Sequence, residues 1–218
     1  LLEHKKNNYL ASVFLDDNSA GISACDISTG EFFTFELPIL KLGEQLETIA
    51  PPEIIVSKKQ KEEIEILMQK LLLSPKITQI DDWIFNDEYA RDILLDQFNT
   101  KNLKGYGIEQ LSSGIISAGA VIHYLKDTQK SNLAHISRIS LFNPSEYMYL
   151  DPSTKRNLEI NFTLQDGERE GSLLSVLDKT ETSMGARLLK KWINAPLQSK
   201  KQIDKRLDCV DDFYKNST

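Results

Sequence analysis

Apolar and polar positions alternate at the beginning of the chain, in a pattern that predicts three short strands. The first is expected at residues 9–15, the second after the turn-forming residues 16–19, and the third at residues 31–37 after a second turn at residues 28–30. Because only short turns connect them, the three strands should be antiparallel neighbours in one sheet.

After Pro38 the spacing of apolar residues changes to that of helices alternating with strands. Three antiparallel strands followed by such crossover units imply an α/β fold, a mixed sheet with flanking helices on both faces, in the ribonuclease H-like order of elements. Helices are predicted at residues 42–49 and around 64–71, strands at residues 54–56 and 76–80, and then a helix capped by Asn86 whose buried stripe is Ala90, Ile93, Leu94 and Phe98.

A longer helix is predicted after Gly105 and Gly107, which interrupt the pattern. It should end by about residue 129, and the more polar stretch from there to Asn143, which contains Ile136, Ile139 and Leu141, is expected to be a linker. One face of the helix is expected to lie along a partner through Leu111, Ile115, Ala118, Ile122 and Leu125, which repeat at spacings of four and three residues.

Residues 144–218 predict helices only, so a second, all-helical part is expected to begin there. Asp151 followed by Pro152 should start a helix that runs to about Ile160, and Ser172 should cap a helix over residues 173–178. A helix at residues 183–193 is expected to pack Leu188, Leu189 and Trp192. The last helix is expected to begin with a capping box of Ser199 and Gln202 and to turn Ile203, Leu207, Val210 and Phe213 inward.

Composition narrows the class of protein. The chain has 218 residues with 26 basic and 32 acidic side chains, and its formal net charge of −6 argues against a dedicated nucleic-acid-binding module. Two isolated cysteines, Cys25 and Cys209, suggest neither a disulfide framework nor a zinc site, so a cytoplasmic location is expected. We expect no membrane span or signal peptide, and because the first residue is not Met, we expect a piece of a longer protein.

Nucleotide and metal sites are not indicated. Gly114 and Gly119 have the spacing of a phosphate-binding loop, but Ala120 and Val121 replace the lysine and hydroxyl residues that such a loop requires. The Gly105-x-Gly107 pair lacks the third glycine of a dinucleotide fingerprint. His4, His123 and His135 have no carboxylate or cysteine at ligand spacing and are expected to be ordinary polar side chains.

A metal-dependent nuclease is the alternative that the order of elements raises. Such enzymes on a ribonuclease H-like sheet need a carboxylate in the first strand, yet residues 9–15 contain none. Asp16 and Asp17 are expected to form a turn, Asp26 to flank one, and Glu53 to begin the fourth strand, so these acids do not converge. The basic groups at Lys58-Lys59-Gln60-Lys61 and at Arg187, Lys190 and Lys191 are expected to be solvated. By elimination, the chain is expected to be a scaffold or relay.

Three ordered motifs in the second part resemble the MutS family of DNA mismatch repair proteins. They run from Tyr149 to Ile160 (YLDPSTKRNLEI), from Glu170 to Asp178 (EGSLLSVLD) and from Thr182 to Leu189 (TSMGARLL). The first part is similar to the connector domain of that family at Cys25 to Phe32 (CDISTGEF), at Gly105-Tyr106-Gly107 and at Tyr124 to Gln129 (YLKDTQ). The resemblance therefore covers the whole chain.

This resemblance implies a connector domain at residues 1–143, ribonuclease H-like but without nuclease activity, and the N-terminal part of the core (lever) domain at residues 144–218. The implied role is a non-enzymatic relay between mismatch-binding and ATPase domains. Neither the Phe-x-Glu mismatch-reading motif nor the phosphate-binding loop occurs here, so no cofactor is expected in this chain. ATP, magnesium, the contact with mismatched duplex DNA and the MutS homodimer are implied for the full-length protein.

The resemblance also implies a docking surface for MutL, at a helix in which Asp92 and Ile93 occupy the matching positions. Some family members carry a Gln-Gln pair there, and Ile93 also belongs to the buried stripe of its helix. The implied structural signature, without catalysis, comprises Asp151, Arg156, Asn157, Leu158, Met184, Gly185 and Arg187. In it Gly185 is expected to allow close helix approach, and Arg187 to pair with a carboxylate or a helix end. An independent protein-interaction adaptor is a further alternative.

Overall fold

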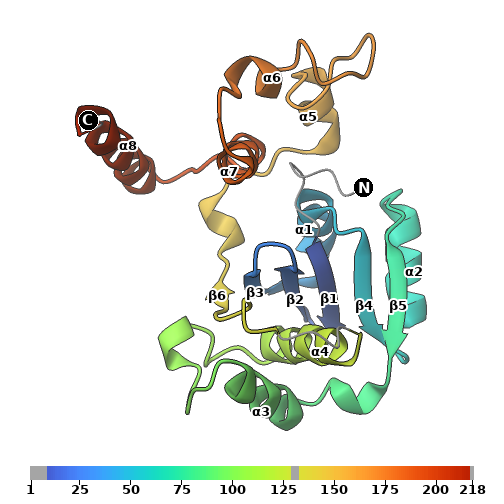
Figure 1. Cartoon of the computed structure of the whole chain (residues 1–218). Helices are drawn as coiled ribbons and strands as arrows, with labels where there is room; N and C mark the ends of the chain where they lie inside the picture. The colour runs from blue at the N-terminus through green and yellow to red at the C-terminus, as the bar shows by residue number, and fades with distance from the viewer. Residues whose placement is uncertain (1–8, 129–132, 217–218) are drawn as a thin grey trace. The chain divides into compact units, whose positions relative to one another are not determined.

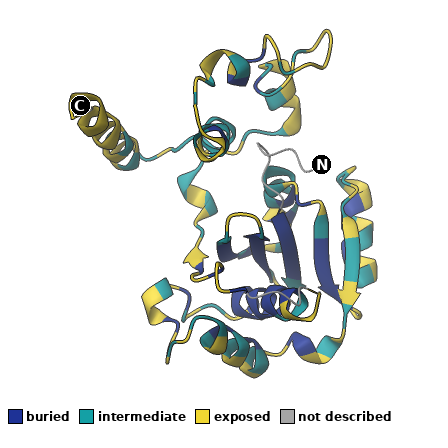
Figure 2. Ribbon diagram, viewed as in Figure 1, coloured by how far each residue is buried: buried dark blue, intermediate teal, exposed yellow. Residues whose placement is uncertain are grey.

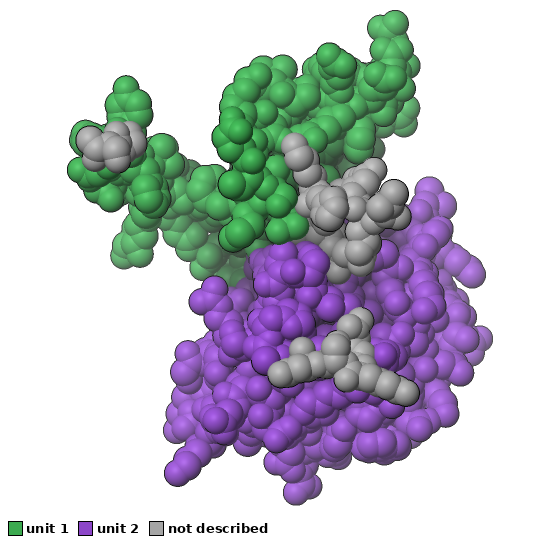
Figure 3. Space-filling view, in the orientation of Figure 1, with its two compact units in different colours: residues 1–6, 143–218 green, residues 7–142 purple. Residues whose placement is uncertain are grey.

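The structure is a computed structural model, and it describes residues 9–128 and 133–216. The chain divides into two compact units, one within residues 7–142 and the other within residues 143–218 (Figure 3). We call them the sheet unit and the helical unit. None of the described helices is both long and apolar enough to cross a membrane.

The sheet unit contains one mixed sheet of six strands (Figure 1). The strands β1 and β2 and the strands β2 and β3 pair antiparallel, whereas the pairs β1 with β4, β4 with β5 and β3 with β6 are parallel. The order across the sheet is β5-β4-β1-β2-β3-β6, so the prediction of a mixed sheet is confirmed. The strands are β1 (Tyr9–Leu15), β2 (Ser19–Asp26), β3 (Glu31–Pro38), β4 (Glu53–Ser57), β5 (Lys76–Ile80) and β6 (Ser140–Leu141).

Helices cover both faces of this sheet, as the sequence predicts, because the central strands are apolar on both sides (Figure 2). On one face, α1 (Leu42–Ile49) and α2 (Lys61–Lys70) bury Leu42, Leu46, Ile64 and Met68 against the strands. On the other face, α3 (Asp87–Gln97) and α4 (Ser113–Thr128) join a second apolar cluster. The predicted cap of α3 is confirmed, because the Asn86 side chain accepts a hydrogen bond of 3.1 Å from the Tyr89 backbone N–H.

Helix α4 is buried on more sides than one apolar seam requires, because it packs against β1, β2, β3 and α3. Small residues make this close packing possible. A methyl group placed on Gly21 in β2 would overlap the Ser113 carbonyl at the start of α4, and one placed on Gly119 would lie 2.5 Å from the Ala90 side chain. The first two turns of α4 therefore lie almost directly on the sheet, and its middle lies almost directly on α3.

The predicted linker before Asn143 is wrong, because much of it belongs to the core of the sheet unit. Leu133, Ile136 and Ile139 are buried in the cluster beneath α3 and α4. Directly after Ile139, the short strand β6 pairs with Phe33 and Thr34 of β3. The apolar residues in that stretch are core positions of an irregular segment, which has no helical or strand period to reveal it.

The helical unit contains α5 (Pro152–Asn157), α6 (Leu173–Leu177), α7 (Ser183–Asn194) and α8 (Lys200–Lys215), so its all-helical character is confirmed. The helical unit also contains the short 3-10 turn η4 (Pro144–Glu146). The sheet unit contains the 3-10 turns η1 (Ile39–Lys41), η2 (Asp82–Ile84) and η3 (Lys104–Tyr106). Helix α5 ends before Ile160, because Glu159 adopts a left-handed backbone with φ of 48°. Ser199 is the N-cap residue of α8, but its side chain makes no capping hydrogen bond, so the predicted capping box does not form.

The stripe of α8 that was expected to turn inward is exposed. The exposed fractions of Ile203, Leu207, Val210 and Phe213 are 38%, 58%, 54% and 77%. The amphipathic pattern of the helix is real, but no described element covers its apolar face. A helix periodicity indicates that a face suits burial, and burial itself needs a neighbouring surface.

Candidate functional site on α3 and α4

The two residues predicted to contact a partner lie on α3, and their surroundings differ. Asp92 is exposed, whereas Ile93 is half-buried and packs against the apolar cluster of the sheet unit. The buried stripe of α3 is formed chiefly by Ala90 and Leu94. Asp92 is therefore the more exposed residue of the pair.

Helix α3 is held firmly against its surroundings by two long side chains. The Arg91 guanidinium donates hydrogen bonds to the Asp87 carboxylate at 2.8 Å and to the Leu111 carbonyl at 2.9 Å. Near the other end of the helix, the Gln97 amide donates to the carbonyls of Leu133 and Ile136 at 3.2 and 3.1 Å. The outward face of α3 is therefore presented in a fixed orientation.

Three aromatic side chains meet beside the first turn of α3. Trp83 of η2 packs edge-on against Tyr89 of α3 and His123 of α4, with ring centroids 4.9 and 5.6 Å apart. The Tyr89 hydroxyl and Nδ1 of His123 share a hydrogen bond of 2.6 Å. Burial lowers the pKa of His123 below 6.5, an effect that the nearby carboxylates oppose, so the ring is neutral at pH 7.

The acids considered for a nuclease centre do not form one. Asp26 flanks the turn after β2 as expected, but it is fully buried, and its carboxylate accepts hydrogen bonds of 2.9 and 2.6 Å from the backbone and hydroxyl of Ser28. Glu53 accepts hydrogen bonds from Lys76 at 2.9 Å, from Thr78 at 2.5 Å and from Tyr124 at 2.9 Å. Within residues 9–128 and 133–216, no group of acidic, His and Cys side chains is placed to hold a metal ion.

The glycine pair with phosphate-loop spacing lies inside α4 and serves packing. The backbone N–H groups of Ser112 and Gly114 both donate to the Glu36 carboxylate of β3, at 2.6 and 2.8 Å. Glu36 thus satisfies the first turn of α4 from a different element and places a negative charge at the positive end of its dipole. The spacing of Gly114 and Gly119 gave no sign of this role, because Glu36 is 78 residues away from Gly114 along the chain.

The signature residues of the helical unit lie mostly at its surface. The Asp151 carboxylate caps α5 by accepting a bond of 3.0 Å from the Thr154 N–H, whereas Arg156, Asn157 and Leu158 are exposed at the end of that helix. Met184 is 73% exposed, and Arg187 is half-buried on α7.

Gly185 was expected to allow another helix to approach closely, but its nearest neighbours belong to the segment just before α7. A methyl group on Gly185 would meet Thr180 and Thr182, which belong to the segment just before α7. The Gly185 N–H itself donates to the Thr182 hydroxyl at 3.0 Å, so this glycine serves the cap of its own helix.

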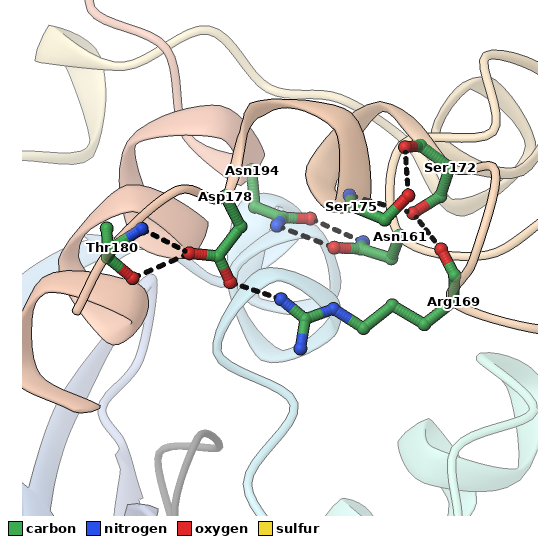
Figure 4. A network of polar contacts seen from close by, with 7 residues as sticks. All are labelled: Asn161, Arg169, Ser172, Ser175, Asp178, Thr180 and Asn194. Carbon is green, nitrogen blue, oxygen red and sulfur yellow. Dashed lines mark hydrogen bonds and ion pairs between the residues drawn. The ribbon is translucent and has the colours of Figure 1, made fainter. Parts of the chain in front are cut away.

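A polar network that the sequence did not reveal holds the loops of the helical unit together (Figure 4). Asp178 is ion-paired with Arg169 and also accepts from the Thr180 hydroxyl at 2.6 Å, the contact that contributes most to lowering the pKa of Asp178. Asn161 and Asn194 exchange two amide hydrogen bonds of 2.8 and 3.0 Å, which tie the loop after α5 to the end of α7. Asp178 lies within a quoted motif and its partners Arg169 and Thr180 are close in sequence, whereas Asn161 and Asn194 are 33 residues apart.

Comparisons with known proteins agree in pointing to one family. The family model described as MutS domain II matches residues 8–137, and that described as MutS domain III matches residues 153–218. Proteins named DNA mismatch repair protein MutS from Chlorobium phaeovibrioides and Salinibacter ruber are 41% and 39% identical over 100% and 97% of this chain. A protein of the same name from Halothermothrix orenii is 40% identical over 99% of it. The chain spans about a quarter of the length of these relatives, 25%, 24% and 24% respectively.

Proposed function

The chain belongs to the MutS family of DNA mismatch repair proteins, and from this premise we propose that it works as a relay and docking segment of a mismatch recognition protein. The sheet unit would be the connector domain, residues 1–143, with a ribonuclease H-like fold. Residues 144–218 would be the N-terminal part of the core (lever) domain. The strand order β5-β4-β1-β2-β3 and the motifs of the helical unit support this division.

In this proposal the chain has no active site of its own. Asp26 and Glu53, two of the acids considered for a nuclease centre, are engaged in structural hydrogen bonds, which argues against the nuclease alternative. ATP with magnesium, mismatched duplex DNA and the second MutS subunit would be bound by the full-length protein. The chain would transmit changes between those sites by rigid-body motion.

Docking of MutL is proposed at the outward face of α3. The observation that carries this proposal is that Asp92 is exposed on a helix that Arg91 and Gln97 hold in a fixed orientation. A rigid helix presenting exposed side chains loses little conformational entropy when a partner binds.

Titration calorimetry of the chain with MutL from the same organism tests the docking role. Asp92→Arg is expected to weaken binding at least about tenfold while leaving the melting temperature unchanged, because Asp92 is exposed. Glu63→Arg, at an exposed position of α2, is the matched control and should bind as the wild type does. Equal binding by the Asp92 variant, or equal loss in the control, would contradict docking on α3.

A further inference from the structure

An exposed tryptophan stands beside the outward face of α3. Trp83 is 57% exposed, although its ring is fixed by edge-on contacts with Tyr89 and His123. Large aromatic rings contribute most of the binding energy in many protein interfaces, and a ring whose orientation is already set loses little freedom on binding. The position of Trp83 therefore suits contact with a partner.

The charge around Trp83 determines which chemistry the partner must have. Residues 81–98 carry six acidic side chains and one basic side chain, a net charge of −5 in a chain whose total is −6. Arg91, the one basic side chain of this segment, is engaged with Asp87 and with backbone carbonyls. Lys58 and Lys126 from other elements are ion-paired with Asp81 and Asp96, so the six carboxylates and these three basic groups together carry a net charge of −3. Nucleic-acid phosphates and anionic lipids are repelled by such a surface, whereas a cationic protein segment is attracted.

The carboxylates near the aromatic ring differ in how they are engaged. Asp81, two residues before Trp83, is ion-paired with Lys58. Glu88 and Asp92 are exposed one helical turn apart on α3, next to the turn that carries Tyr89. A guanidinium group over the indole ring would gain a cation–π contact and also reach carboxylate acceptors.

We propose that Trp83 receives an arginine side chain from a cationic segment of the docked protein, and that Glu88 and Asp92 pair with neighbouring cationic groups. The inference rests on the proposed function in so far as MutL is that protein. The aromatic site itself belongs to the sheet unit and can be probed without MutL.

The first experiment uses hexaarginine as the probe. Trp83 and Trp192 are the two tryptophans of the chain, so in a Trp192→Phe variant the fluorescence comes from Trp83 alone. At low salt, hexaarginine should change this fluorescence saturably, and Glu88→Gln with Asp92→Asn should weaken its binding about tenfold. Glu62→Gln with Glu63→Gln on the exposed part of α2 is the charge-matched control and should leave binding unchanged. Equal weakening by both pairs, or binding without a change in Trp83 fluorescence, would overturn the inference.

The second experiment is calorimetric titration of Trp83→Ala with MutL. We expect binding about tenfold weaker than that of the wild type, with an unchanged far-ultraviolet circular dichroism spectrum as the control for folding. If MutL binds and Asp92→Arg weakens it while Trp83→Ala does not, the inference is wrong and docking on α3 stands. If MutL does not bind the wild-type chain, the docking proposal is wrong, and the hexaarginine titration still decides the role of Trp83.

Discussion

Gly119→Ala tests how closely α3 and α4 approach each other. Two effects of the added methyl group oppose each other. Alanine is the better helix former, by about 1 kcal/mol. Against this, the methyl group would lie 2.5 Å from Cβ and 2.6 Å from Cα of Ala90, whereas carbon atoms prefer separations of about 3.5–4.0 Å.

The steric effect should exceed the gain in helix propensity. One of the two close atoms is backbone, so no side-chain rotation relieves the overlap, and α4 has β1, β2 and β3 on its other side. The helices would have to separate by roughly 1 Å, and overpacking of this kind costs about 1–3 kcal/mol. The expected net result is a free energy of unfolding lower by about 1–2 kcal/mol.

Urea unfolding followed by Trp83 fluorescence in the Trp192→Phe background measures the effect in the sheet unit. Gly105→Ala is the control, since a methyl group there meets no described atom within 4 Å, and its effect should stay within about 0.5 kcal/mol. Combined with Ala90→Gly, the Gly119→Ala loss should shrink, because one of the two close atoms is removed. An increase in stability of about 1 kcal/mol for Gly119→Ala, as helix propensity alone gives, would refute the reasoning.

Three further predictions concern titratable groups. Glu36→Ala removes the acceptor that satisfies the start of α4 and should lower the free energy of urea unfolding by about 1 kcal/mol, with a smaller loss for Glu36→Gln. Burial raises the pKa of Glu53, but its hydrogen bonds outweigh that effect and lower the pKa below 4.5. The ionised carboxylate therefore stabilises the folded chain fully above pH 4.5, and this stabilisation is lost as the pH falls through the pKa of Glu53 in the folded state. Stability of Glu53→Gln should therefore depend less on pH in that acid range, and an unchanged dependence in acid titrations would contradict this. Burial raises the pKa of the Cys25 thiol to about 12 while Cys209 is exposed, so a thiol reagent should find one reactive group in the native chain and two after unfolding.

The elements that could be predicted from the sequence are those with local signals. Asn86 and Ser172 cap α3 and α6 through residues three positions away, and those contacts are visible in the sequence as a spacing. Strand β6 has only two residues and no pattern of its own, and it exists because Phe33 and Thr34 of β3 offer an edge to pair with. Its formation depends on a neighbour 107 residues away, which no local pattern can indicate.

Burial was harder to predict than secondary structure. Ser117 in α4 has the polarity of a surface residue, yet it is fully buried and shares a hydrogen bond of 2.6 Å with Ser23 of β2. On α8, Leu207 has the spacing of a buried residue and is 58% exposed. In the candidate site, Asp92 and Ile93 were reached through resemblance, and their contact with MutL stays a prediction. The cluster of Trp83, Tyr89 and His123 comes from three elements, and no spacing in the sequence brings them together.

The pairing of β3 with β6, which lies about 100 residues later in the chain, also has a consequence for synthesis of the chain on the ribosome. Strand β3 ends at Pro38 and its partner β6 lies at residues 140–141, so about 100 residues must be added before the sheet can be completed. At roughly 5–20 residues per second this takes about 5–20 s, and α4, which packs on β1, β2 and β3, is complete only at Thr128, near the end of that interval. Folding of the sheet unit during translation should therefore occur in one late step, and a nascent chain tethered by an arrest peptide should develop pulling force only after Leu141 has left the exit tunnel.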